Sequence, residues 1–306
     1  MATFAIYSYK LHKAAQIPEF DFPNMESYSK VELLESKQDY FQQIFQEDID
    51  KKKLFECKNS NKRSKSPTIY ESRILWIKDN IIVLQIANRR KKIINVNFTK
   101  KETDDFPWCN IIVDNRKDIQ HIAIHNNNAF RSADIIAGIL QHSFNIRLKQ
   151  WGLESTIDPM YRSAMFWHNV KRFENVGIHQ LRFDYDFPNP PWLSELIGDA
   201  VNEHARHLNG KPTLQYTAKK DGRLNLQKDD EHLQNLVRGA AGTGTDIALI
   251  PNGSHTVVHC KEDNKQMRVH EEMPDKFMQN WNDKDLFDTK HQRTIEFVNN
   301  IKLFYD

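Results

Sequence analysis

Residues 110–152 constrain the fold most, because they have the pattern of two short strands followed by one long helix. Runs rich in β-branched residues occupy 111–113 and 119–124, and polar residues separate them, which is typical of buried strands. Ser132 is in the position of an N-cap and Gly152 in that of a C-cap. Between them, apolar residues recur at the three- and four-residue steps of one wide helix face: Ile135, Ile136, Ile139, Leu140, Phe144, Leu148 and Trp151. We therefore expect a β-β-α unit that organises a core, with the helix over 132–151.

The first half of the chain predicts further strands and one more helix. Strand patterns cover 3–9, 74–77, 81–86 and 93–98, with a suitable hairpin turn at 78–80. Consecutive strands favour local antiparallel pairing, so 74–98 should form a three-stranded meander in one sheet with 3–9 and 111–124. Ser29 and Glu32 form a capping box, from which we expect a helix over 30–55. The helix over 132–151 would cover one face of this sheet.

The second half repeats this mixture of strands and helices. We expect strands over 153–157 and 178–187, hairpins over 213–227 and 246–260, and helices over 191–208, 229–240 and 290–305. Asp158 with Pro159 matches an N-cap followed by proline at the first helical position. The fold class is therefore α+β, with mostly antiparallel sheets, covering helices and two lobes, 1–152 and 153–306. One continuous domain is the alternative.

Composition narrows the class of protein further. No run of about 18 apolar residues occurs, and the first residues lack the basic-then-apolar order of a secretory signal. Cys57, Cys109 and Cys260 are far apart and fit no metal or redox pattern, which favours a reducing cytoplasm. Abundant Lys, Asn and Ile with only 10 Gly are typical of a bacterial protein from an AT-rich genome. We therefore expect a cytoplasmic globular protein without a membrane span.

Two basic segments are the clearest functional signal. The net charge is only +2, but the basic residues are concentrated in two stretches. Exposed lysines and arginines bind phosphates by releasing counterions, and Trp108 is near enough in sequence to stack on bases, whereas Trp76 fits a core strand. The residues that we predict to contact nucleic acid are Lys51, Lys52, Lys53, Lys62, Arg63, Lys65, Arg89, Arg90, Lys91 and Lys92. Solvated surface loops are the alternative interpretation.

A second candidate is catalytic. Asp246 followed by Asp263 and Lys265 is similar to the layout of restriction-type nucleases, in which acids hold a divalent metal and a lysine stabilises the developing charge. In those enzymes the second acid and the lysine lie inside the next strand, a place that residues 259–261 (His-Cys-Lys) fill here. A solvated hairpin end is therefore the simpler interpretation of these residues.

Other polar patterns are less specific. His255 and His259 are four apart on one expected strand, and His204 and His207 are three apart on one expected helix. Neither pair has a third zinc ligand in its pattern, so a solvated face is the simpler interpretation. The polar loop 114–116 interrupts an apolar region, which predicts either a site or a turn.

The leading hypothesis is a protein that binds nucleic acid or acts beside a nucleic-acid enzyme, with a role in defence against phage or mobile elements expected only from base rates. One alternative is an interaction subunit whose basic loops meet an acidic protein partner. A metal-dependent nuclease that uses Asp246, Asp263 and Lys265 is the other. No cofactor follows from the sequence.

Overall fold

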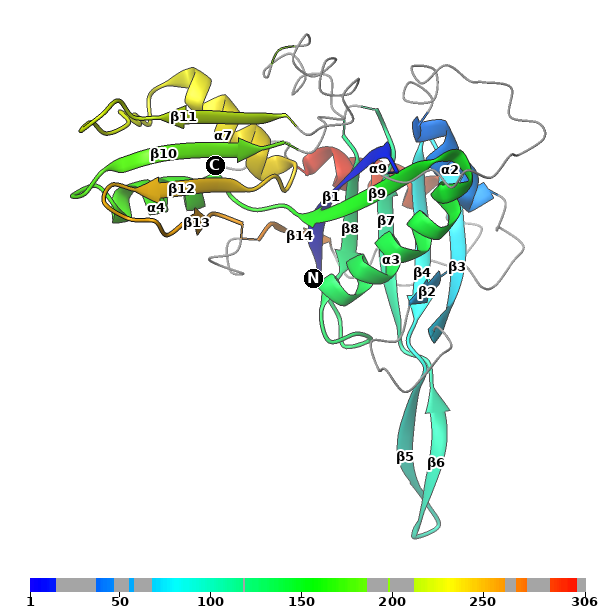
Figure 1. Ribbon diagram of the computed structural model, residues 1–306. Coiled ribbons are helices and arrows are strands. Elements are labelled where there is room, and N and C mark those ends of the chain that lie inside the picture. Colours follow the sequence, from blue (N-terminus) through cyan, green and yellow to red (C-terminus); the bar gives the residue numbers. More distant parts are fainter. Residues whose placement is uncertain are drawn as a thin grey trace.

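In the part of the chain that the structure describes, the fold consists of two antiparallel sheets with covering helices and one free two-stranded ribbon (Figure 1). It is known from a computed structural model that describes residues 1–14, 37–46, 55–57, 68–117, 119–185, 198, 212–261, 268–273 and 287–301. The predicted α+β class with antiparallel sheets is confirmed. Within the described ranges, no helix is both long enough and apolar enough to cross a bilayer.

The larger sheet takes its strands from the whole length of the chain. Their order is β14-β1-β8-β7-β4-β3-β2, and β9 pairs with β1 as well. The turn predicted at 78–80 is confirmed, because Asp79 and Asn80 both have positive φ between β3 and β4, as a two-residue type I′ turn requires. The strands are β1 Ala2–Lys13, β2 Phe55–Cys57, β3 Thr68–Lys78, β4 Ile81–Ala87, β7 Trp108–Asp114, β8 His121–His125, β9 Leu153–Pro159 and β14 His270–Met273.

Helices cover both faces of this sheet. Ile82 and Leu84 of β4 share one apolar cluster with α3 (Ala133–Leu148) and α2 (Lys37–Gln46). Val83, which points the other way, shares a second cluster with α9 (Phe287–Asn300). Figure 1 shows α3 lying across the strands on one side. Burial on both faces explains why the central strands β4 and β7 are mostly apolar rather than alternating, and the buried Gln85 and Asn110 that interrupt them are hydrogen-bonded to each other.

The helix predicted over 132–151 is confirmed. Ser132 is at the N-cap position of α3, although its side chain makes no capping hydrogen bond. A 3-10 turn, Lys149–Trp151, follows α3, and Gly152 ends it with a φ of 65°, in the left-handed region that glycine adopts without strain.

The smaller sheet has the order β11-β10-β12-β13. Leu181, Phe183 and Tyr185 alternate inward along β10 as expected, and they share an apolar cluster with α4 and α7. The elements are α4 Ala164–Arg172, β10 Ile178–Asp184, β11 Thr213–Thr217, α7 Glu231–Gly242, β12 Ile247–Pro251 and β13 Val258–His259. The expected hairpin over 246–260 and helix over 229–240 are therefore present, whereas the expected helix over 191–208 lies outside the described residues apart from Gly198.

Residue 152 is not the boundary between the part of the chain that forms the larger sheet and the part that forms the smaller one. β9 follows that residue and pairs with β1 along seven residues, from Tyr7↔Pro159 to Lys13↔Leu153. β14 pairs with β1 too, and α9 packs on the same sheet. The C-terminal half therefore supplies both the smaller sheet and part of the larger one, because β8 pairs with one edge of β1 and the later strands β9 and β14 pair with the other.

The predicted meander over 74–98 is wrong in its third strand. β5 (Arg90–Val96) leaves the sheet and pairs only with β6 (Thr99–Asp105), which the sequence patterns did not reveal. β7 takes the place beside β4 instead. The reason is composition, since β7 offers an apolar run to bury on both faces and β5 begins with three basic residues.

Three other local predictions are also wrong. Asp158 and Pro159 end β9 instead of starting a helix, and α4 begins only after Ser163. The expected helix over 30–55 does not reach its predicted end, because Phe55 is in β2 and pairs with β3. Residues 224–227 form no strand, since β11 pairs with β10 instead.

Candidate nucleic-acid interface

The ribbon of β5 and β6, here called the arm, extends away from the larger sheet (Figure 1). Its strands pair in register from Arg90↔Asp105 to Val96↔Thr99. Asn97 and Phe98 form the two-residue turn between them and have φ values of 49° and 62°. Every residue of β5 is exposed, and so is all of β6 except Asp105, so the arm contributes almost nothing to either core.

The half of the arm nearest the sheet is neutralised by ion pairs. Arg89 contacts Asp104 at 2.8 Å, Arg90 contacts Asp105 at 3.2 Å, and a third pair joins Lys91 to Glu102 at 3.1 Å. The hydrogen bond from Arg89 lowers the pKa of the Asp104 carboxyl. Three of the four basic residues predicted here therefore have a carboxylate partner on β6, which the analysis of β5 alone missed.

Beyond Lys91, the arm keeps an unbalanced positive charge. Lys92, Lys100 and Lys101 form no salt bridge with any other described residue. Between and beyond them are four exposed apolar side chains: Ile93, Ile94, Val96 and Phe98. The arm thus combines a basic surface with an apolar end.

A polar hollow of about 600 Å³ lies at the base of the arm, lined by Asn88, Arg90 and residues 126–131. Hydrogen bonds hold this loop to the arm: Arg90 Nη1 donates to the Asn128 carbonyl at 3.2 Å and Asn88 Nδ2 to the Ala129 carbonyl at 2.9 Å. The guanidinium of Arg131 is exposed at the edge of the hollow. Amide and guanidinium groups are the donors that bind phosphate and sugar oxygens in nucleic-acid complexes.

Two aromatic side chains are exposed next to this hollow. Trp108 is 55% exposed at the start of β7, and its carbonyl accepts a hydrogen bond from Asn127 at 2.9 Å. Phe106 lies just after β6, with the Arg89 guanidinium 5.9 Å from its ring centre. Exposed rings of this kind can stack on unpaired bases. Trp76, by contrast, is buried in the core, as its strand pattern predicted.

The other predicted basic segment cannot be placed relative to the arm. Its side chains, Lys51, Lys52, Lys53, Lys62, Arg63 and Lys65, lie outside the described residues. Only Arg89, Arg90, Lys91 and Lys92 of the predicted contacts are described, and they come together on the arm.

Asp246, the first residue of the predicted nuclease motif, is hydrogen-bonded to His259 and Lys261. It immediately precedes β12, and one carboxylate oxygen is 2.5 Å from Nδ1 of His259. The backbone N–H of Lys261 donates to the other oxygen at 3.2 Å. Asp263 and Lys265 lie outside the described residues, so the catalytic assignment of the three residues stays a prediction.

Lysines near Asp246 neutralise Asp158 at the junction of the two sheets. The Lys261 ammonium is bonded to one oxygen of Asp158, and Lys10 lies 3.6 Å from the other. Lys10 also donates to Thr245 at 3.4 Å. These contacts tie β1 and β9 of the larger sheet to the start of β12. Among the described residues, no three His, Cys, Asp or Glu side chains gather as a metal site would need.

The predicted histidine pairs and polar loop do not form a site together. His255 lies in the loop before β13, so it does not share a strand with His259, and His204 and His207 are outside the described residues. In the polar loop, the buried Asp114 accepts hydrogen bonds from Nη2 of Arg116 at 2.6 Å and from Nε of Arg116 at 2.9 and 3.2 Å. This loop is a buried ion pair at a strand end, so the interpretation as a turn fits better than that as a site.

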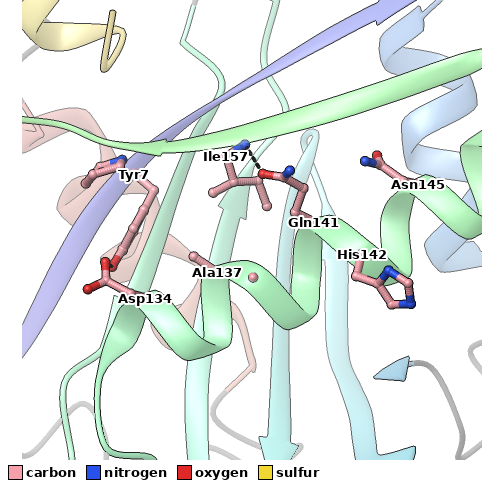
Figure 2. Close-up of a pocket in the computed structure, with 9 residues that line it drawn as sticks. Tyr7, Asp134, Ala137, Gln141, His142, Asn145 and Ile157 are labelled. Atoms are coloured by element: carbon pink, nitrogen blue, oxygen red, sulfur yellow. Dashed lines mark hydrogen bonds between the residues drawn. The ribbon is translucent and has the colours of Figure 1, made fainter. Parts of the chain in front are cut away.

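A second hollow, of about 370 Å³, separates α3 from β9 (Figure 2). At one end Tyr7 donates to Asp134 at 2.8 Å, and burial, followed by this hydrogen bond, raises the pKa of the Tyr7 hydroxyl. At the other end, the side-chain oxygen of Gln141 accepts a hydrogen bond from the backbone N–H of Ile157, and that of Asn145 accepts one from the backbone N–H of Ser155. These amides satisfy the free edge of β9, so the polar groups of this hollow have a structural explanation.

No model of a known protein family matches this chain, and neither a curated protein nor a solved structure matches it.

Proposed function

We propose that the protein binds nucleic acid with the arm and with the hollow at its base. The observation that carries this proposal is the part of the arm beyond Lys91, where Lys92, Lys100 and Lys101 lack carboxylate partners among the described residues. Each phosphate that such a lysine neutralises releases counterions, which supplies affinity without reading sequence. The ion pairs nearer the sheet are at the surface, where such pairs contribute little, so phosphates can compete with the carboxylates for Arg89 and Arg90.

The base of the arm adds contacts of a second kind. Arg90 and Arg131 border a hollow large enough for a nucleotide, and Trp108 lies beside it as a stacking surface. A backbone that lies along the arm would bring its neighbouring nucleotides to this hollow. The proposal therefore combines lysines that bind phosphates with an aromatic and amide surface that binds the nucleotides themselves.

A titration of labelled nucleic acid at two salt concentrations tests this proposal. Duplex DNA, single-stranded DNA and RNA would be titrated at about 50 mM and about 200 mM salt and followed by fluorescence anisotropy. The triple variant Lys92→Gln, Lys100→Gln, Lys101→Gln should lower affinity and make the slope of log affinity against log salt less steep by about 2 to 3. If wild-type protein binds none of the three at low salt, the proposal is wrong.

Lys219 and Lys220 provide the matched control. Both are exposed and follow β11 in the smaller sheet, away from the arm (Figure 1). Lys219→Gln with Lys220→Gln removes comparable charge and should leave affinity and slope unchanged. An equal loss in both variants would mean that net charge, and not the arm, determines binding. If the arm variant instead releases a stoichiometric protein partner that resists nuclease, the arm is a protein-interaction surface.

A further inference from the structure

The turn of the arm combines two unfavourable features in one residue. Phe98 is 109% exposed, and its φ of 62° is in the left-handed region. The second position of a type I′ turn strongly favours glycine, because a side chain there is strained. The aromatic side chain at this position is therefore not buried and does not stabilise the turn. Residues in strained backbone conformations cluster at functional sites, so Phe98 is a candidate for contact with a ligand.

The side chains behind Phe98 are ordered along the arm. Lys92, Ile94 and Val96 share one face, and the strand pairing places Lys101 opposite Ile94 on that face. Ile93 and Lys100 are on the other face. The first face therefore runs from Lys92 to apolar groups toward the turn, and on the second face Lys100 lies nearer the turn than Ile93. β5 has 7 residues and spans roughly 20 Å, so the arm reaches well beyond the sheet.

We infer that the end of the arm enters the minor groove of duplex DNA and wedges Phe98, with Val96 and Ile94 behind it, between stacked base pairs. This inference rests on the proposed function and names its substrate. Phosphates line both walls of a groove, which matches lysines on both faces of the arm. The minor groove carries few distinguishing polar groups, and apolar side chains inserted there unstack and kink the duplex.

Two other occupants fit the arm less well. Among the described strands, each arm strand pairs on one side only, so its other edge offers N–H and C=O groups that no described strand takes up. Such edges are costly in the hydrocarbon of a membrane, whereas a hydrated groove leaves them in water. Pairing of that edge with a second copy of this chain is opposed by the lysines of both strands.

Phe98→Gly tests the inference without damaging the arm. It creates an Asn-Gly sequence, the most favoured type I′ turn, and removes the aromatic side chain. Phe98→Trp is the matched variant that keeps a large ring at the same place. Equal thermal midpoints for the three proteins would show that folding is unaffected.

The measurement uses a duplex that contains 2-aminopurine and a pair of dyes at its ends. Wild type and Phe98→Trp should raise 2-aminopurine fluorescence several-fold and increase energy transfer, because bases unstack and the duplex bends. Phe98→Gly should bind within about tenfold of wild-type affinity, with the same salt dependence, but lose both signals.

The outcomes separate this inference from the proposed function. Wild-type binding to the duplex with neither signal overturns the wedge and leaves nucleic-acid binding in place. Absence of binding to any nucleic acid overturns both. Two further results would overturn the wedge. A dimer that Phe98→Gly dissociates would overturn the wedge alone, whereas wild type that sediments with phosphatidylserine vesicles but not with DNA would count against DNA binding as well.

Discussion

The hairpins β3–β4 and β5–β6 follow one another in the chain and have the same turn, yet they have opposite environments. Both close with two residues of positive φ, Asp79 with Asn80 and Asn97 with Phe98. β4 is buried along almost its whole length, and β5 is exposed along all of it. The turn geometry therefore does not determine whether a hairpin joins a sheet.

The partner strands explain the difference. β4 lies between β3 and β7, whose apolar residues pack with it on both faces. β5 contains Ile93, Ile94 and Val96, but its partner β6 has no apolar residue at all. A ribbon with one apolar strand cannot form the buried face that an antiparallel sheet needs for stability. The apolar residues of the arm are thus left for something other than the core.

The largest expected difference between the hairpins is in core energetics. Leu84→Ala in β4 removes a fully buried side chain and should destabilise the fold by about 3 to 5 kcal/mol. Ile93→Ala in β5 removes a side chain that is 68% exposed and should change stability by less than about 0.5 kcal/mol. Urea unfolding followed by circular dichroism measures both. A comparable loss from Ile93→Ala would show that the arm packs against the body in solution.

Between pH 7 and pH 5, the free energy of unfolding should depend on a histidine of the larger sheet. The arm contains no histidine and should not contribute to this dependence. His121 in β8 is buried, and this desolvation lowers its pKa from 6.5 to about 4. Below pH 6.5 His121 is protonated in the unfolded chain but stays neutral in the folded chain. The free energy of unfolding therefore falls as the pH drops toward 4. The loss attributable to this group between pH 7 and pH 5 is about 2 kcal/mol.

The variant His121→Gln isolates this contribution, because glutamine does not titrate. Urea unfolding of both proteins at the two pH values should give a smaller difference for the variant than for wild type, whatever its stability at neutral pH. Equal differences would mean that the pKa of His121 is the same in the folded and the unfolded chain.

Secondary structure could be predicted where the apolar residues of one segment alone determine whether it forms a strand or a helix. The strands at 111–113 and 119–124 and the helix that ends at Gly152 are such segments, and all are present. Local patterns could not show that β9 pairs with β1 or that β5 leaves the sheet, because both depend on which distant strand offers a better edge or face. The isoleucines of β5 are typical of a core strand, and only the polar sequence of its partner β6 shows that β5 has no apolar face to share.

The candidate site was predictable only in part for the same reason. Arg89 to Lys92 were identified as exposed and basic, but the carboxylates that neutralise three of them are on β6. A two-residue turn at Asn97 and Phe98 would have placed those acids opposite β5. Phenylalanine at the second turn position hid this signal, because sequence rules expect glycine or asparagine there.

The smallest expected difference concerns the second turn residue of each hairpin. Asn80→Gly replaces a residue that already tolerates the left-handed region and should change stability by only a few tenths of a kcal/mol. Phe98→Gly relieves a bulky side chain in the same conformation, so the arm should open less readily by about 1 kcal/mol. Hydrogen exchange of the β5 and β6 amides, compared with that of β4, measures this local opening. Because the arm contributes nothing to either core, the global urea midpoint should not move, and a shift of that midpoint by Phe98→Gly would show that the arm and the sheet unfold as one unit.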